Sequence, residues 1–307
     1  MLRLPMICAL AAFAFTAPLL AACSSENTPA KTIDAAQSAD NAEKMVIKTK
    51  LAEILAAQSE ESKARYNMRN PAQTLEFFGI EPGMKIAEAL PGGGWYSKIL
   101  IPFLGDEGSL TGMDYSVNMW PEFGSFATAE FIENRKSWPA EWTARTQEWR
   151  MGSNAGVDAY TFGTRKTSQD GTYDAVLFIR ALHNLSRFES KGGYMTQAIA
   201  DTHAMLRPGG IAAVVQHSGP ESNSDEWAIG SNGYLKKSAV IAAFEAAGFE
   251  LAGDSDINHN PKDIPSESDN VWRLPPTLRN SKDNPELKAK LEAVGESNRM
   301  TLKFRKL

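Results

Sequence analysis

Short apolar runs alternate with stretches of helical periodicity along most of the chain after Pro71. The apolar runs predict six β-strands, which are Lys85–Ala89, Ser109–Met113, Tyr173–Ile179, Ile211–Gln216, Phe249–Gly253 and Met300–Arg305. Apolar residues three or four positions apart predict helices between them, at Trp95–Leu104, Gly124–Lys136, Met195–Leu206 and Lys236–Ala247. Strands that alternate with helices form a mostly parallel sheet with both faces covered, so an α/β fold is expected.

The pattern leaves one strand undecided. Between Ser109–Met113 and Tyr173–Ile179, either Ala144–Arg150 or Gly156–Phe162 could supply it. Further along, residues 254–298 are polar and rich in proline, apart from a short predicted helix at Glu286–Ala293. Connections inside a compact domain are usually only about 4–6 residues long. This excursion therefore either covers a substrate or forms a surface flap.

The folded part is expected to begin at the helix Val46–Ala57, where apolar residues recur at helical spacing. Residues 23–45 before it are mostly small and polar, which predicts a flexible tether. We accordingly divide the chain into a signal peptide at 1–22, a tether at 23–45 and a folded domain at 46–307.

The first residues predict export. Residues 4–20 are apolar and follow Arg3, a run shorter than a comfortable membrane span. The sequence Leu20-Ala21-Ala22-Cys23 resembles the bacterial lipobox, in which cleavage precedes the cysteine and its thiol is lipidated. This resemblance implies a lipoprotein of the cell envelope that faces the periplasm, and Ser24 after the cysteine resembles lipoproteins that are sorted to the outer membrane. An ordinary cleaved signal or a loosely inserted anchor is the alternative.

Composition excludes several classes of function. The formal net charge is −5 and the chain has no block of basic residues, which argues against a nucleic-acid partner. Of the two cysteines, Cys8 lies in the signal and Cys23 is the expected lipid site, so disulfides and cysteine–zinc sites are not expected. Residues 254–258 open like a calcium loop, but His259 replaces the required glycine, and no metal is expected. The motifs of zinc hydrolases, serine hydrolases and P-loop enzymes are also missing from the sequence.

A glycine-rich stretch follows the first predicted strand. Pro91, Gly92, Gly93 and Gly94 come directly after this strand, which carries the acid Glu88 near its end. The next strand is followed by Asp114 and Tyr115, where a carboxylate could bind the hydroxyls of a ribose and a ring could lie against an adenine. In doubly wound sheets ligands bind beyond the carboxyl ends of the strands, so a nucleoside site is expected here.

With these segments the chain resembles the class I S-adenosylmethionine-dependent methyltransferases, and among them a subgroup of exported predicted methyltransferase lipoproteins. The resemblance is carried, in this order, by RNPAQTLEFFGIEPGMKIAEALPGGGWYSKIL, GSLTGMDYS, YDAVLFIRALHNL, LRPGG and NRMTLKFRKL. It implies a Rossmann-like fold whose seven-stranded, mostly parallel sheet has helices on both faces and an antiparallel last strand. It also implies S-adenosyl-L-methionine as cofactor and a small-molecule methyl acceptor.

The resemblance assigns cofactor-binding roles position by position. Glu88 matches the acid that opens the family's first motif, and Gly92 and Gly94 match its second and third glycines. Asp114 matches the ribose-binding acid, and Asp158 is assigned as counterpart of the adenine-side acid. Leu90 stands where the family has its first glycine, a departure that changes how closely the cofactor can approach.

The residues that contact the methyl acceptor are expected after the strand Tyr173–Ile179, the fourth when the undecided strand is counted. His183 follows that strand together with Arg180 and Asn184, and we assign these three as the catalytic candidates. His217, after the next strand, should face the same edge, although either histidine could be purely structural. Further upstream, a polar cluster of Arg65, Arg69 and Asn70 could close over the site or form surface salt bridges.

Two other functions fit the same residues. A nicotinamide-dependent oxidoreductase would use Gly92 and Gly94 with Ser97 as its dinucleotide loop. A non-catalytic envelope binding protein would keep the fold without the chemistry, since export removes the domain from the compartment that makes the methyl donor. Methyl transfer remains the expectation that accounts for the last strand and the glycine loop together.

Overall fold

The computed structural model describes residues 35–307, with side chains from residue 39. Residues 43–307 form one compact unit, and the described part of the other unit is the start of the first helix, residues 35–42. The expected signal peptide and the expected lipidation site, Cys23, lie outside the described residues. No helix in the described range is long and apolar enough to span a membrane.

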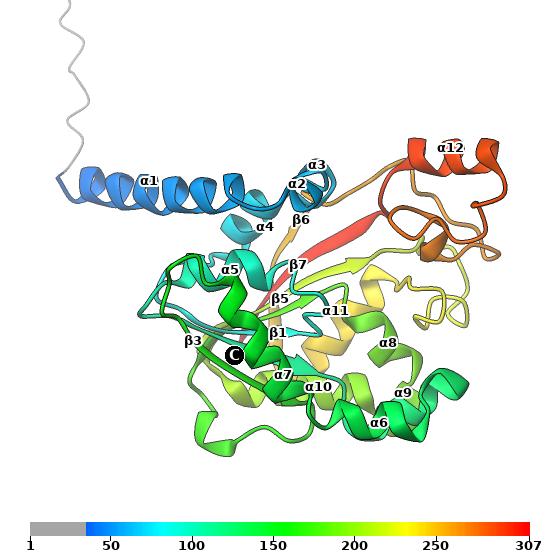
Figure 1. The fold of residues 1–307 in the computed structure, drawn as a ribbon, viewed down its shortest axis with the longest axis horizontal. Coiled ribbons are helices and arrows are strands. Elements are labelled where there is room, and N and C mark those ends of the chain that lie inside the picture. Colours follow the sequence, from blue (N-terminus) through cyan, green and yellow to red (C-terminus); the bar gives the residue numbers. More distant parts are fainter. Residues whose placement is uncertain (1–34) are drawn as a thin grey trace, which may run out of the picture. The chain divides into compact units, whose positions relative to one another are not determined.

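A seven-stranded sheet forms the centre of residues 43–307, in the order β3-β2-β1-β4-β5-β7-β6 (Figure 1). Its strands are β1 Lys85–Ala89, β2 Ser109–Asp114, β3 Gly156–Thr161, β4 Tyr173–Ile179, β5 Leu206–His217, β6 Phe249–Ser255 and β7 Arg299–Lys306. Strands β1 to β5 pair in parallel, and β7 is antiparallel to both β5 and β6. The expected seven-stranded fold with an antiparallel last strand is confirmed.

The helices connect these strands and precede the sheet. Those before β1 are α1 Ala35–Ala56, α2 Glu60–Lys63, α3 Tyr66–Arg69 and α4 Pro71–Phe78. Those between β1 and β4 are α5 Ser97–Leu104, α6 Ala129–Arg135 and α7 Trp138–Arg145, with 3-10 turns η1 Val117–Phe126, η2 Thr146–Trp149 and η3 Thr167–Gln169. Those after β4 are α8 Leu182–Arg187, α9 Glu189–Gly192, α10 Tyr194–Met205, α11 Lys237–Ala246, η4 Val271–Arg273 and α12 Pro285–Val294.

The structure shows which segment forms the strand left undecided by the sequence, and it differs from one predicted helix. Gly156–Thr161 forms β3, whereas residues 144–149 lie in the end of α7 and in η2, so the alternative at Ala144–Arg150 is wrong. The helix expected at Gly124–Lys136 is interrupted, because Gly124 takes a non-helical conformation with φ 73°. A new helix starts after Thr128, whose hydroxyl accepts a hydrogen bond from the backbone N–H of Phe131 at 3.2 Å.

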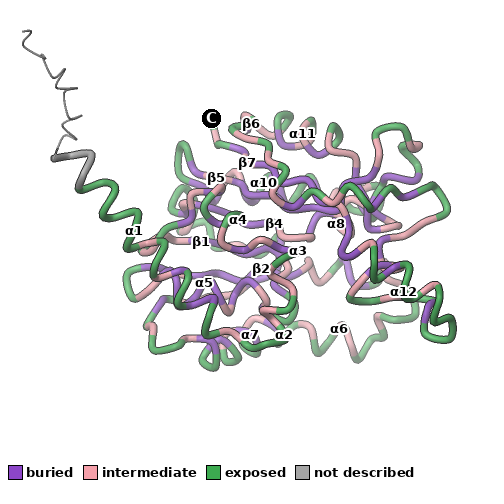
Figure 2. Tube along the Cα trace, turned by 90° about the horizontal axis from the view of Figure 1, so that it is seen from above, coloured by how far each residue is buried: buried purple, intermediate pink, exposed green. Residues whose placement is uncertain are grey.

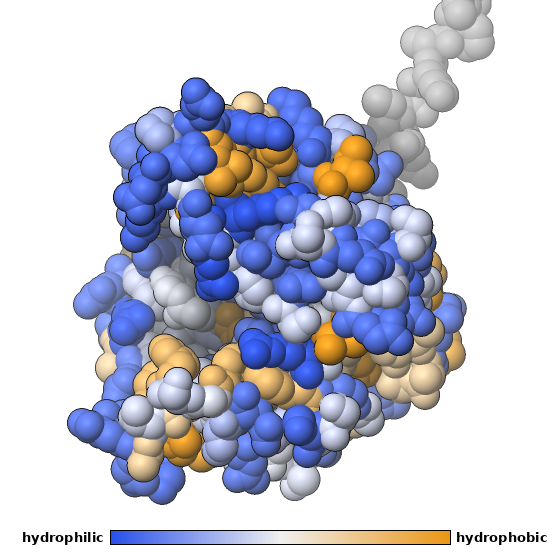
Figure 3. All heavy atoms as spheres, turned by 90° about the vertical axis from the view of Figure 1, so that its right-hand side faces the viewer, coloured by the Kyte–Doolittle hydropathy of each residue, from blue (hydrophilic) through white to orange (hydrophobic). Residues whose placement is uncertain are grey.

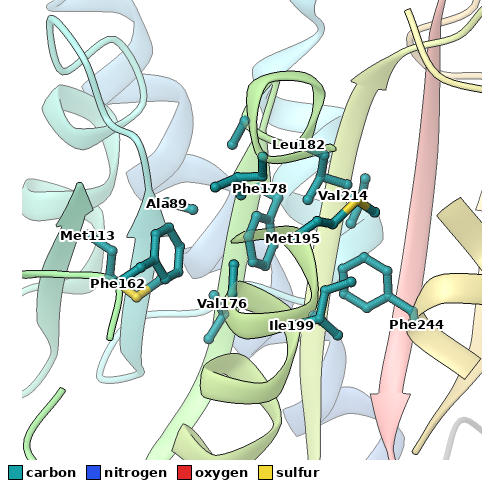
Figure 4. Packing of buried hydrophobic residues seen from close by; sticks show 14 of the residues in the cluster. Ala89, Met113, Phe162, Val176, Phe178, Leu182, Met195, Ile199, Val214 and Phe244 are labelled. Carbon is teal, nitrogen blue, oxygen red and sulfur yellow. The ribbon is translucent and has the colours of Figure 1, made fainter. Parts of the chain in front are cut away.

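Apolar residues cover both faces of the sheet because successive side chains of a strand point to opposite sides. On one face, Val176 and Phe178 of β4 pack with Ile199 of α10 and Phe244 of α11 (Figure 4). On the other face, Ala175 and Leu177 join a second cluster with α4, α5 and the last turns of α1. Figure 2 shows the strands as mostly buried and the outer sides of the helices as exposed. The carboxyl edge of β1, β2, β4 and β5 is left for the loops, which build the site.

Candidate functional site

Two cavities meet at the glycine loop. The first, about 310 Å³, extends from the loop to Arg180, His183 and His217, and we call it the arginine-side cavity. The second, about 380 Å³, lies beside Asp114, and we call it the tryptophan-side cavity because Trp120, Trp138 and Trp142 line it. Both volumes fall in the range of small-molecule sites, about 300–1,000 Å³. Leu90 and Gly92 line both cavities, so the two spaces are neighbours across the loop.

The backbone of the glycine loop turns sharply after β1. Leu90, Gly92 and Gly94 have φ values of 54°, 55° and 76°, in the left-handed region. The turn is held by the N–H of Leu90, which donates to Met113 at 2.7 Å, and by the N–H of Gly94, which donates to Pro91 at 2.8 Å. Leu90 thus adopts, at a steric cost, a conformation to which glycine is better suited.

Gly94 is required for a different reason. A Cβ added there would lie 2.4 Å from the ring of Trp149, which covers the loop from η2. At Gly92 an added Cβ would meet only the carbonyl oxygen of Leu90, at 3.9 Å, and at Gly93 nothing within 4 Å. The outer side of the loop is therefore open for a ligand, and its inner side is closed by an aromatic ring.

Glu88 is buried beneath the loop and lines the arginine-side cavity. Its carboxylate accepts a hydrogen bond, at 2.6 Å, from the hydroxyl of Ser97, which is the first residue of α5. Burial raises the pKa of Glu88 to about 7, and the hydrogen bond from Ser97 acts in the opposite direction. A cationic ligand next to this carboxyl group would favour its ionised form.

Asp114 ends β2 and lines the tryptophan-side cavity, but it is not free. Arg135, the last residue of α6, forms an ion pair with one carboxylate oxygen of Asp114. The Arg135 guanidinium lies 5.0 Å from the ring centre of Trp120 and 5.5 Å from that of Trp138. Burial raises the pKa of Asp114, although Arg135 acts in the opposite direction. A ribose at this carboxylate would have to share it with Arg135 or displace it.

The tryptophans of this cavity were not predicted as site residues. Three donors around this cavity are buried without a hydrogen-bond partner among residues 35–307. They are the indole N–H groups of Trp120 and Trp142 and the Nε–H group of Arg135. Buried donors normally find an acceptor, so these three atoms are exceptions among the residues around the cavity. A pair of tryptophans four residues apart in Trp138–Trp142, next to the basic Arg135, was the available sequence signal.

Tyr115 links this cavity to α8. It lines the tryptophan-side cavity, and its hydroxyl accepts a hydrogen bond from the Asn184 side chain at 2.9 Å. Burial raises the pKa of Tyr115 to about 12, so the phenol is neutral at physiological pH. Asn184 lines neither cavity and acts on the site only through this hydrogen bond.

His183 and His217 lie together in the arginine-side cavity, with ring centres 5.7 Å apart. Burial lowers the pKa of His183 to about 4, and burial with the charge of nearby groups lowers that of His217 well below its usual range. Both imidazoles are therefore neutral at pH 7. His217 Nδ1 lies 2.6 Å from the Ser297 hydroxyl, whereas His183 Nδ1 is buried with no partner in the described part of the chain.

An arginine cluster borders the same cavity. The buried carboxylate of Glu296 lies 2.5 Å from Arg65 and 3.2 Å from both Arg69 and Arg299. Arg65 and Arg69 thus form a buried network rather than surface salt bridges. Asn70 does not join them, since its side chain donates to the carbonyl of Ile257 at 2.6 Å. Glu296 and Arg299 were not predicted, because they lie more than two hundred residues further along the chain.

The excursion before β7 covers the arginine-side cavity. Residues from its middle line the cavity, namely Val271, Trp272, Leu274, Pro275, Pro276 and Thr277, and Glu296 and Ser297 line it from its end. Of the two roles left open by the sequence, the structure places the segment over the cavity. Figure 3 views the side of the molecule that carries α12, where hydrophilic residues predominate and hydrophobic ones form separate patches.

The predicted site residues fall into four groups, and Gly92 belongs to two of them. Glu88, Pro91, Gly92, Gly93, Arg180 and His183 line the arginine-side cavity, and Gly92, Asp114 and Tyr115 line the other. Gly94 and Asn184 line neither cavity: Gly94 packs against Trp149, and Asn184 donates a hydrogen bond to Tyr115. Asp158 lies within β3, paired with Thr111 of β2, and its carboxylate contacts Lys166 at 3.3 Å. Asp158 lines neither cavity. No cluster of metal-ligating side chains occurs among residues 35–307.

Comparison with known proteins finds distant likenesses of fold. No protein-family model matches the sequence, and no curated protein matches it. Among solved structures, the chain is similar to a SAM-dependent methyltransferase from Aquifex aeolicus (12% identity, 84% of this chain and 98% of that chain, TM-score 0.46). It is similar to a putative sarcosine dimethylglycine methyltransferase from Galdieria sulphuraria (13%, 82% and 89%, TM-score 0.46). A third similar structure is the [4+2]-cyclase SpnF (16%, 78% and 80%, TM-score 0.46). The fold class is assigned from the strand order and strand directions of this chain, and not from these likenesses.

Proposed function

We propose that this protein is an S-adenosylmethionine-dependent methyltransferase that acts on a small-molecule acceptor. The observation that carries the proposal is that Gly92 and Asp114 line one cavity, while Gly92 also lines the neighbouring cavity with Arg180 and His183. A single elongated ligand over the glycine loop would reach from one cavity to the other. The adenosyl part would then lie beside Asp114 and the reactive part beside His183.

The residues fit such a cofactor in kind. Asp114 and Tyr115 would hold the nucleoside, between the rings of Trp120 and Trp142 that line the same cavity. Pro91, Gly92 and Gly93 would lie under the methionine part, and Glu88 would face its positive charge. Because Arg135 is ion-paired with Asp114, binding requires this pair to open or to share the carboxylate.

The protein's part in the reaction would be to position and to exclude water. S-adenosylmethionine, when bound, supplies an electrophilic methyl group, so alignment with the acceptor provides most of the acceleration. Neutral His183 and His217 could accept a hydrogen bond or a proton from the acceptor, which a protonated imidazole could not. Trp272 and the rest of the excursion would shield the reacting atoms from solvent.

We further propose that the domain acts in the cell envelope, anchored through a lipid on Cys23 and facing the periplasm. The support is the Leu20–Cys23 sequence with its preceding apolar run. The membrane would be contacted through the lipid only. Metabolic labelling with a palmitate analogue tests this: wild-type protein should be labelled, and the Cys23→Ser variant should not be.

The function is tested by calorimetric titration of the full-length protein with S-adenosylmethionine and S-adenosylhomocysteine. Wild-type protein should bind both, and Asp114→Ala should weaken each by at least about tenfold, because the loss of charge-assisted hydrogen bonds costs about 1.5–3 kcal/mol. Asp225→Ala is the matched control, since Asp225 is exposed and pairs with Lys236 elsewhere on the surface. Binding that is unaffected by Asp114→Ala would refute the proposed site.

A non-catalytic binding protein is the second candidate. The observations that favour it are the ion pair of Arg135 on Asp114 and the Leu90 side chain between the two cavities. This reading predicts no binding of either adenosyl compound by the wild-type protein. The same titration therefore separates the two functions.

A further inference from the structure

The arginine-side cavity has more positive charge than the described protein groups neutralise. Arg65, Arg69, Arg180 and Arg299 surround a single ionised acid, Glu296. Burial alone would raise the pKa of Glu296, but these arginines lower it overall, so the acid is charged. The other nearby acid, Glu88, has a pKa of about 7 and carries only part of a charge at neutral pH. His183 and His217 are neutral and neither add nor remove charge.

Arg180 is the arginine that remains unused. Glu296 contacts Arg65, Arg69 and Arg299 directly, whereas the Arg180 side chain makes no hydrogen bond or ion pair with any residue from 35 to 307. Its backbone is well anchored, since its N–H donates to the Val215 carbonyl at 2.6 Å. It follows β4 directly, and it lines the cavity. A partly buried guanidinium has five donors, and leaving them unpaired is costly.

The remaining walls show what kind of molecule could bring the missing negative charge. Trp95 comes from the end of the glycine loop and Trp272 from the excursion, and both line the cavity with Ile179. Trp95 is already held by Arg69, whose guanidinium lies 4.7 Å from its ring centre. Flat apolar walls next to one unpaired guanidinium suit a small ring that carries a carboxylate. A guanidinium binds a carboxylate through two parallel hydrogen bonds.

We propose that the arginine-side cavity binds a carboxylate-bearing aromatic acceptor, whose carboxylate pairs with Arg180. Naming this ligand as the methyl acceptor rests on the proposed function, whereas the anion site itself does not. The same chemistry has a second source, the carboxylate of the cofactor's methionine part. We assign the acceptor because Arg180 lies in the cavity with the histidine pair and the excursion, where the reacting group would be.

The experiment uses benzoate as the anionic probe and benzamide as its neutral counterpart of similar shape. Both are titrated calorimetrically into the full-length protein, with and without saturating S-adenosylhomocysteine. The variant is Arg180→Met, which keeps a straight side chain at the same backbone position. The matched control is Arg207→Met, which removes the same charge from the opposite edge of the sheet, where Arg207 is half exposed and pairs with Asp174.

Wild-type protein and Arg207→Met should bind benzoate at least about tenfold more tightly than benzamide. Arg180→Met should lose this preference and keep its affinity for S-adenosylhomocysteine. Its melting temperature without ligand should also rise above that of the wild type, because an unpaired charge has been removed. A structural arginine would have the opposite effect on melting, so a fall in melting temperature would overturn the proposal, as would an unchanged preference for benzoate.

The cofactor is separated as a source by comparing S-adenosylhomocysteine with methylthioadenosine, which lacks the amino-acid carboxylate. If Arg180→Met weakens the first compound and not the second, Arg180 binds the cofactor and the acceptor assignment is wrong. If wild-type protein binds neither adenosyl compound but shows the Arg180-dependent preference for benzoate, the proposed methyltransferase function fails and the anion site stands. If it binds the adenosyl compounds but shows no preference for benzoate, the function stands and the anion site fails.

Discussion

Glu88 combines an ionisable group, near-complete burial and a position under the glycine loop. Its one hydrogen bond to a side chain comes from Ser97, and it has no ion pair within residues 35–307. The Glu88→Gln variant keeps the size of the side chain and an oxygen that can accept from Ser97, but it removes the charge. We expect this variant to be more stable than the wild type above neutral pH.

The size of the effect follows from the pKa. Glu88 has a pKa of about 7 in the folded protein against 4.5 as the ordinary value. Between these values the native state binds more protons than the unfolded state, so wild-type stability falls as the pH rises through this window. A shift of about 2.5 units corresponds to about 3 kcal/mol once the pH exceeds 7, and to about 1 kcal/mol at pH 5. The variant should gain these amounts relative to the wild type.

Urea denaturation followed by tryptophan fluorescence at pH 5 and pH 8 measures the difference. Comparing variant with wild type at each pH cancels the contributions of other titrating groups. Glu250→Gln serves as the control, because Glu250 is an exposed acid paired with Arg305 and should show a small effect at both pH values. A gain at pH 8 no larger than at pH 5 would show that Glu88 is ionised in the folded protein without cost, and the reasoning would fail.

The other two predictions concern the network and the loop. Glu296→Gln leaves Arg65, Arg69 and Arg299 without their carboxylate, and it should lower the free energy of unfolding by about 3–5 kcal/mol in the same urea assay. A loss no greater than that of Glu133→Gln, at an exposed pair with Lys136, would mean that the network contributes little. Leu90→Gly relieves a left-handed leucine by about 1–2 kcal/mol and adds the chain entropy of glycine, about 0.5–1 kcal/mol. The net change in stability should be a gain of about 0–1.5 kcal/mol. Binding of S-adenosylhomocysteine should tighten, because the leucine side chain no longer lies at both cavities. Weaker binding by this variant would show that Leu90 contributes to the site.

The sequence by itself determined six of the seven strands and the position of the loop. A mostly apolar run such as Tyr173–Ile179, whose one charged residue is Asp174, is typical of a strand in the middle of a sheet, and the alternation with helices predicted a parallel sheet. The glycines after β1 and the acid after β2 indicated one edge, since the carboxyl ends of parallel strands lie together. These patterns lie within single segments of the chain, so they predict local structure without knowledge of the rest of the fold.

Only the tertiary structure decided what surrounds that edge. Arg135 reaches Asp114 from twenty-one residues away, and Glu296 reaches Arg65 from more than two hundred. Neither pairing has a periodic signal, because nothing in a polar residue's own segment tells which distant charge it meets once the chain is closed. Whether Arg180 is neutralised likewise depends on all the groups that converge on the cavity. Charge balance in a buried site is a property of the whole fold, since removal from water makes the energy of each ion depend on every neighbour.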